Sequence, residues 1–134
     1  MIIALCVDDE YGMLFHGRRQ SRDRILIERL MKIGKRICVN AYSAKLFSPL
    51  PVNVSVQETF LENAEPEDIC FVENIAITAL PENCERLILY HWNRRYPADQ
   101  YFPVEELKKW KLKSTCDFPG NSHDVITEKI YEKR

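Results

Sequence analysis

An unbroken apolar run, IIALCV at positions 2–7, stands at the start of the chain and is followed directly by three acidic residues. A continuous run of this length is typical of a strand covered on both faces, which is the central position of an α/β sheet. Further strands are expected at 36–40 (RICVN), 69–72 (ICFV) and 86–92 (RLILYHW). The sequence therefore predicts an α/β protein built around buried strands.

One amphipathic helix is expected at 21–33, because apolar residues recur there at spacings of three and four. Ser21 is the expected N-cap, and Asp23 would lie in the first turn, where a negative charge suits the helix dipole. Gly34 is placed to end the helix as a residue in the left-handed conformation.

The remaining expected elements are a helical turn near 43–47, an edge strand at 52–57, a polar connection at 62–68, short helices at 75–80 and 104–110, and a hairpin of 110–118 with 124–132. This order predicts a mostly parallel central sheet with flanking helices and an antiparallel C-terminal hairpin. There are no repeats or linkers, so we expect one domain over residues 1–134. Its edge strand could pair with a second copy to form a homodimer.

Composition narrows the classes of partner. A net charge of −1 gives no overall field to attract nucleic acid or a membrane. No apolar run approaches the roughly 18 residues of a membrane span, and the N-terminus has no basic leader typical of a signal peptide. The five cysteines form no C-x-x-C pair, and three of them lie in apolar runs. We therefore expect reduced core thiols and a cytoplasmic protein.

Taken in order, these segments resemble the dihydrofolate reductase family. That family opens with an apolar strand ending in Val-Asp, a glycine loop, a helix with an acidic residue and a second strand; the matching segments are IIALCVDDEYGMLFHG, RRQSRDRILIERLMKIG and KRICVN. Its closing segments are matched by RLILYHW, PADQ, YFP, ELKKW and EKIYEKR. The resemblance implies a dihydrofolate reductase-like fold, shortened between about residues 52 and 69.

The resemblance also implies a site. Asp23 falls about where the family places its catalytic carboxylate, which holds the pterin ring and helps deliver a proton while a nicotinamide delivers hydride. A carboxylate suits this role because it accepts two parallel hydrogen bonds; alternatively, Asp23 is simply a favourable first-turn residue. The implied substrate-binding positions are Leu5, Ile27 and Tyr90, and the implied cofactor-binding positions are Asn40, Ser43 and Asn74.

Several departures from the family pattern argue against folate reduction. The Pro-Trp before the first helix is replaced by Arg19-Gln20-Ser21, and the late-strand threonine by Tyr90. The family's glycine pair, which lets the backbone approach the cofactor pyrophosphate, is Glu73-Asn74 here. A carboxylate at that point would repel phosphate, which weakens the case for NADP. The arginine that clamps the folate glutamate is not found; Asn53 is the nearest polar residue.

The most distinctive local feature is the arginine-rich segment HGRRQSRDR at 16–24, which contains Arg18, Arg19, Arg22 and Arg24. Arginine forks beside a helix N-terminus favour an anion site for a nucleotide, a phosphorylated metabolite or RNA. The alternative is a solvated helix face in which Arg24 pairs with Glu28.

Other chemistries find little support. The three histidines belong to no metal-binding motif, so no metal site is expected, and no P-loop or dinucleotide glycine motif occurs. Three hypotheses follow. The favoured one is a fold-retaining protein that binds a phosphorylated or nucleotide-type ligand through the arginine-rich segment and the first helix. The alternatives are an NAD(P)H-dependent reductase of a small heterocycle with Asp23 as its carboxylate, and an RNA- or protein-binding module.

Overall fold

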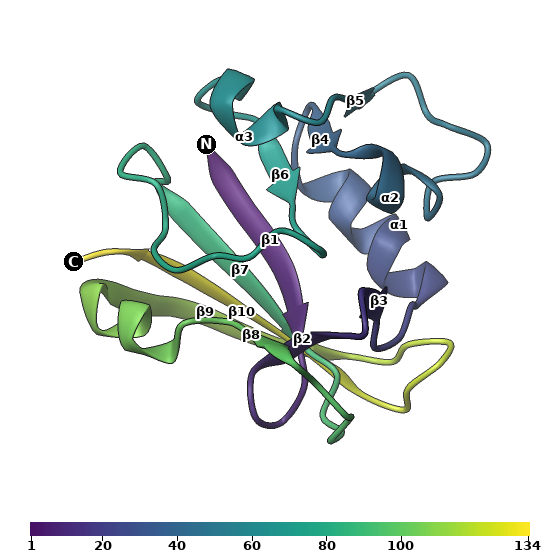
Figure 1. Ribbon diagram of the computed structural model, residues 1–134, viewed down its shortest axis with the longest axis vertical. Helices are drawn as coiled ribbons and strands as arrows, with labels where there is room; N and C mark the ends of the chain where they lie inside the picture. Colours follow the sequence, from purple (N-terminus) through teal and green to yellow (C-terminus); the bar gives the residue numbers. More distant parts are fainter.

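The computed structural model describes residues 1–134, which form a seven-stranded sheet, a small three-stranded sheet and a few short helices (Figure 1). The elements are β1 (Ile2–Val7), β2 (Gly12–Phe15), β3 (Arg18–Arg19), α1 (Arg24–Ile33), β4 (Ile37–Val39), α2 (Ala41–Ala44), β5 (Val54–Val56), α3 (Phe60–Asn63), β6 (Ile69–Phe71), β7 (Arg86–His91), β8 (Gln100–Tyr101), the 3-10 helix η1 (Val104–Lys109), β9 (Trp110–Phe118) and β10 (Ile126–Lys133).

The large sheet has the strand order β5-β4-β6-β1-β7-β10-β9. Strand β1 lies in the middle and pairs in parallel with β6 and β7, while β10 runs antiparallel to both β7 and β9. Strand β5 closes one edge, as expected for the 52–57 segment. The predicted mostly parallel sheet with an antiparallel C-terminal hairpin is therefore confirmed.

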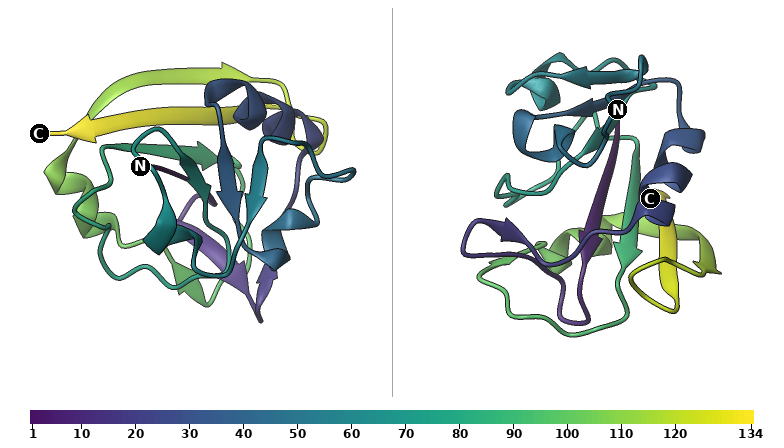
Figure 2. Two further views of the ribbon diagram at one scale, coloured as in Figure 1. Left: turned by 90° about the horizontal axis from the view of Figure 1, so that it is seen from above. Right: turned by 90° about the vertical axis from the view of Figure 1, so that its right-hand side faces the viewer.

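Strand β1 is central because both of its faces are covered. Ile3, Leu5 and Val7 pack into one apolar core, and Ala4 packs into a second core on the opposite face. Helix α1 supplies Leu26, Ile27 and Leu30 to that second core, so it covers one face of the sheet (Figure 2). The start of α1 and the end of β1 thereby bound the cleft in which this fold would place a ligand.

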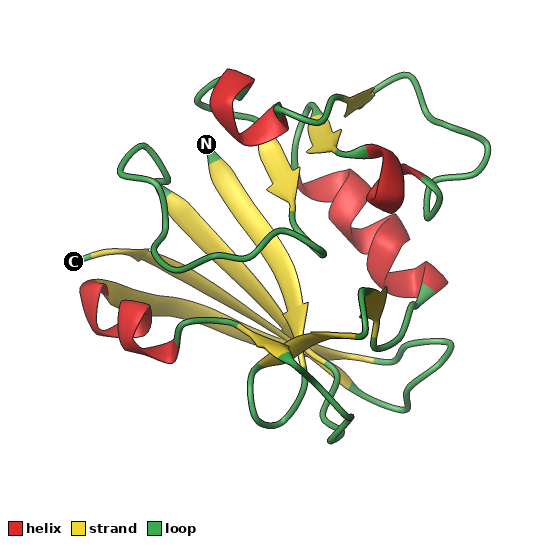
Figure 3. Cartoon of the chain, viewed as in Figure 1, coloured by secondary structure: helices red, strands yellow, loops and turns green.

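The first helix begins later than the sequence prediction. Asp23, not Ser21, is its N-cap, because the Asp23 carboxylate accepts a hydrogen bond from the Leu26 N–H at 3.1 Å. Gly34 follows the helix in an extended conformation with φ −132°, so the expected left-handed ending is wrong. The helices, red in Figure 3, are all short. Helix α1 has ten residues, and no helix is long and apolar enough to cross a membrane.

One other expectation fails locally, and one helical segment begins earlier than expected. Residues 75–80 form a loop rather than a helix, because Ile75 and Ile77, two positions apart, both pack on the core as in an extended chain. The turn expected near 43–47 is α2 at Ala41–Ala44, since Asn40 caps it two residues earlier. The small sheet β3-β2-β8 was not expected, because strands of two to four residues are too short to show a periodic pattern.

Candidate functional site

The cleft between β1 and α1 is almost completely filled. A cavity of about 10 Å³ remains there, lined by residues that include Cys6, Asp23, Ile27 and Trp92. A single water needs roughly 10–15 Å³ of such space, so this cavity has no room for a heterocyclic ring. Four of its lining residues also line a larger groove on the outer side of the helix: Arg22, Asp23, Ile27 and Leu46. The side chains that would surround a small substrate pack against each other instead.

Both carboxylate oxygens of Asp23 accept hydrogen bonds from the chain itself. Its side chain caps α1, and its Oδ2 accepts from both the N–H and the hydroxyl of Ser122, each at 2.8 Å. Burial opposes ionisation of Asp23, but the hydrogen bonds from Ser122 and Leu26 outweigh it and lower the pKa of the carboxyl. Asp23 therefore holds no proton near neutral pH, and both of its oxygens are already engaged.

A chain of polar contacts continues from Asp23 across the mouth of the cleft. His123 Nδ1 lies 2.7 Å from the Ser122 hydroxyl oxygen, and the Tyr96 hydroxyl lies 2.7 Å from His123 Nε2. The His123 ring stacks on Trp92 with a centroid distance of 4.7 Å. This network ties the β9–β10 connection to the start of α1. Sequence reasoning missed it because no pattern links Asp23 to a residue 99 positions away.

The three positions expected to bind a cofactor do come together, but they bind the chain itself. The Ser43 hydroxyl donates to Glu73 Oε1 at 2.8 Å, and Asn40 Nδ2 donates to Asn74 Oδ1 at 2.7 Å. Arg19 makes a two-pronged pair with the Glu73 carboxylate at 2.9 and 3.0 Å and lies over the Tyr42 ring.

Glu73 decides whether a dinucleotide phosphate fits at this place. Its side chain is only 10 % exposed, and its carboxylate uses the donors of Arg19 and Ser43 that a phosphate would need. A second anion would meet this buried negative charge at close range. The residues around Glu73 therefore do not fit the NADP diphosphate. They provide no site for the cofactor that would donate hydride.

The three substrate-binding positions implied by the resemblance, in contrast, do not come together. Leu5 packs in the core on the face of the sheet opposite Asp23. Tyr90 is fully buried, and its hydroxyl donates to Glu128 Oε2 at 3.0 Å, away from the cleft. Ile27 alone lines the residual cavity.

The four arginines of the 16–24 segment separate in the structure. Arg19 is taken by Glu73, and Arg18 lies by a groove lined by Phe15 and Tyr96. Arg22 and Arg24 instead line another groove, beside Lys45. Two of the first N–H groups of α1 are used by Asp23 and Asn121, so the helix start is already capped.

This second groove, which we call the α1 groove, runs between α1 and the 45–51 segment and has a volume of about 600 Å³. Its apolar side is formed by Ile27, Met31, Leu46 and Phe47. Its charged residues are Arg22, Arg24, Lys45, Asp23 and Glu28. Arg22 and Lys45 form no ion pair, and the Arg24–Glu28 contact is long, at 3.9 Å between exposed side chains. The α1 groove thus joins an apolar surface to cations that remain free.

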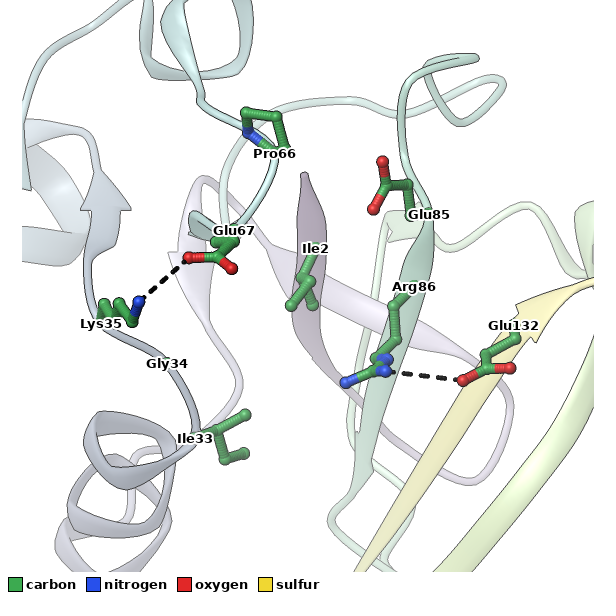
Figure 4. Close-up of a pocket in the computed structure, with 9 residues that line it drawn as sticks. All are labelled: Ile2, Ile33, Gly34, Lys35, Pro66, Glu67, Glu85, Arg86 and Glu132. Carbon is green, nitrogen blue, oxygen red and sulfur yellow. Dashed lines mark hydrogen bonds and ion pairs between the residues drawn. The ribbon is translucent and has the colours of Figure 1, made fainter.

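A groove of about 530 Å³ at the other end of the sheet is less suited to a ligand (Figure 4). It lies at the amino ends of the parallel strands, beside Ile2 and Arg86, whereas open α/β sheets bind ligands at the carboxyl ends. Its charges also pair with one another: Lys35 lies 3.4 Å from Glu67, and Arg86 lies 3.5 Å from Glu132.

No cluster of three or more His, Cys, Asp or Glu side chains is placed to hold a metal ion. Burial raises the pKa of the Cys6 thiol at the cleft floor, so Cys6 is a poor nucleophile. Neither a metal-ligand cluster nor an activated thiol is present among the residues of this site.

His91 gives the clearest expected pH dependence. Burial lowers its pKa to about 4, and its Nε2 atom is buried without a partner. The unfolded chain, with an ordinary histidine pKa near 6.5, then binds the proton more readily. We expect stability to be complete above pH 6.5 and to fall as the pH drops from 6.5 to 4, by at most about 2–3 kcal/mol because solvent screens part of the ring.

The measurement is urea unfolding at a series of pH values for the wild type and His91→Gln. Removing the titrating ring should flatten the slope between pH 4 and 6.5. An unchanged slope in His91→Gln would assign the pH dependence to other groups.

The comparisons with known proteins agree with this architecture. No family model and no curated protein sequence matches the chain. In structure it is similar to a dihydrofolate reductase from Enterococcus faecalis complexed with NADP(H) and RAB-propyl, with a TM-score of 0.69 and 10 % sequence identity. The match covers 100 % of this chain and 96 % of that one.

The fold and site together define an α/β protein with a large seven-stranded sheet and a small three-stranded one, in which side chains of the chain itself fill the β1–α1 cleft. The fold is that of dihydrofolate reductase, as the sequence predicted. At 10 % identity the likeness shows the fold alone, so activity has to be argued from the residues of this chain.

Proposed function

We propose that this chain is a ligand-binding protein that captures an anionic, mononucleotide-sized molecule in the α1 groove and does not reduce folate. The observation that carries the proposal is the α1 groove itself, where Arg22 and Lys45 stand free beside an apolar surface. Its volume of about 600 Å³ lies within the usual range of small-molecule sites, roughly 300–1,000 Å³.

The residues of the groove suit the two parts of such a ligand. Arginine offers a planar fork of donors that matches phosphate or carboxylate, and Lys45 adds a mobile point charge. Met31, Leu46 and Phe47 give a flat ring an apolar surface to cover. The capped start of α1 leaves side chains, rather than backbone N–H groups, to hold the anion.

The alternative, an NAD(P)H-dependent reductase, is favoured only by the fold. It would need room between Asp23 and the cleft floor at Cys6, where about 10 Å³ remains, since the other side of Asp23 opens into the α1 groove. It would need a place for the cofactor phosphates, and Glu73 occupies the position that the resemblance implies for them. It would also need a proton on Asp23, whose pKa is lowered by its hydrogen bonds. All three observations favour a ligand-binding protein over a reductase that transfers hydride.

A thermal-shift panel tests the proposal. Wild-type protein is heated with AMP, FMN, NADPH, dihydrofolate and inorganic phosphate at low salt. A ligand present at about 100 times its Kd adds about 2.7 kcal/mol and should raise the Tm by roughly 5–10 °C. We expect AMP or FMN to stabilise the protein and added salt to reduce the effect. No shift with any compound at millimolar concentration would reject the proposal.

A further inference from the structure

Strands β4 and β6 place two cysteines directly opposite each other. Cys38 and Cys70 are register partners in the parallel pairing, so their side chains leave the sheet on the same face, and both belong to the same apolar core. They are 4 % and 0 % exposed, and Cys70 Sγ lies 3.7 Å from Met1 Sδ. Neighbouring strands are about 4.8 Å apart, within the roughly 4.4–6.8 Å between Cα atoms that a disulfide spans.

The two thiols differ in acidity because they contact each other. The interaction with the neighbouring Cys70 lowers the pKa of Cys38 in spite of its burial, and the interaction with Cys38, together with burial, raises the pKa of Cys70. Cys84, buried in the same core, contacts no second cysteine, and burial raises its pKa. Cys38 is therefore the better nucleophile of the reduced pair. Once Cys38 is part of a mixed disulfide, it no longer raises the pKa of Cys70, and Cys70 then lies beside it as the resolving thiol.

We propose that Cys38 and Cys70 form a redox-active dithiol that a low-molecular-weight disulfide oxidises to an intramolecular disulfide. The Cys38 thiolate attacks one sulfur of the small disulfide, forming a mixed disulfide and releasing one thiolate. The Cys70 thiol loses its proton to solvent and attacks Cys38 Sγ, which releases the second small thiol. The protein loses two electrons and two protons, and the small disulfide is reduced to two thiols.

Access to this pair runs through α3. Phe60 of α3 packs against the same core, but α3 has only four residues and its N-cap makes no side-chain hydrogen bond. A short uncapped helix of this kind is expected to open locally at low cost. The pair also lies just before the contact between Asn40 and Asn74, so its disulfide would join the two strands that carry this polar contact (Figure 1).

The test uses the wild-type folded protein in buffers that range from reduced to oxidised glutathione. The reaction is stopped with acid, free thiols are alkylated in denaturant, and products are mapped by mass spectrometry. At the oxidised end, we expect a peptide link between Cys38 and Cys70, with buried Cys84 still alkylatable and exposed Cys116 carrying a glutathione adduct. Cys38 and Cys70 both alkylatable throughout the range, or a link between other cysteines, would overturn the proposal.

Cysteine variants and a denatured control test which cysteines pair and whether the pairing requires the folded protein. Cys84→Ser should keep the link and Cys116→Ser should exclude pairing between chains, whereas Cys70→Ser should leave at most a glutathione adduct on Cys38. The same treatment in urea should scatter the pairing over all five cysteines, because the β4–β6 register is lost. A 38–70 link that forms equally well in urea would contradict a preformed site. If a variant does not fold, the wild-type peptide map decides alone.

Discussion

Glu128→Ala is expected to lower the free energy of unfolding by about 3 kcal/mol, the lower end of the cost of breaking a buried charge pair, because the Arg29 side chain is 34 % exposed. The Glu128 carboxylate, itself buried, accepts two hydrogen bonds from Arg29 at 2.9 and 3.0 Å and one from the buried Tyr90 hydroxyl at 3.0 Å. Burial raises the pKa of Tyr90, so the phenol stays protonated and donates. Alanine would leave both donors without a partner.

Urea unfolding of Glu128→Ala and three further variants measures this effect. Tyr90→Phe removes one hydrogen bond and should cost about 1.5–3 kcal/mol, and the double variant should cost less than the sum because the two residues share that bond. Glu132→Ala, on the same strand and also paired with an arginine, is the matched control and should cost at most about 1 kcal/mol because its pairs are exposed. Equal losses for Glu128→Ala and Glu132→Ala would show that burial of the pair is not what stabilises it.

Removing the free charges of the α1 groove should produce the largest functional effect. In the triple variant R22A/R24A/K45A, the affinity for whichever of AMP or FMN binds the wild type is expected to fall about 10- to 100-fold. The reason is that these side chains supply the donors that face an anion across the apolar surface. Calorimetric titration at two salt concentrations measures both the loss and the smaller salt dependence that should accompany it.

A second triple variant, R18A/R94A/R95A, removes the same formal charge from exposed positions outside the α1 groove. It should bind nearly as the wild type does. If both triple variants lose affinity equally, the attraction is a general field effect, and the α1 groove is not the site.

The fold was predictable because the sequence pattern of each main element extends over several consecutive residues. The apolar run of β1, the periodic face of α1 and the alternating hairpin each express one structure over six or more residues. The short strands β2, β3 and β8 carry too few residues to show any period, and their pairing depends on the tertiary fold.

The site was only partly predictable, because the role of each residue depends on contacts with segments that are distant in the sequence. The family resemblance identified Glu73 as a residue that would repel phosphate, but only the structure shows it paired with Arg19, 54 positions away. Asp23 lies at the start of the first helix as expected, yet its role as a cap bonded to Ser122 could not be read from the chain. The arginine cluster is continuous in sequence and divided in space, since β3 and the start of α1 point its members to different partners.

On the proposed function, the filled β1–α1 cleft distinguishes this protein from a working reductase, and a paired calorimetric titration tests this distinction most directly. NADPH is compared with 2′,5′-ADP, which carries the same adenosine half and a similar charge but no nicotinamide. The cleft has about 10 Å³ left, and Glu73 lies where the resemblance implies the cofactor phosphates. The nicotinamide half should therefore add nothing, and the two Kd values should agree within about threefold. NADPH binding at least about tenfold tighter than 2′,5′-ADP would show that the cleft is open and would contradict a binding protein without reductase chemistry.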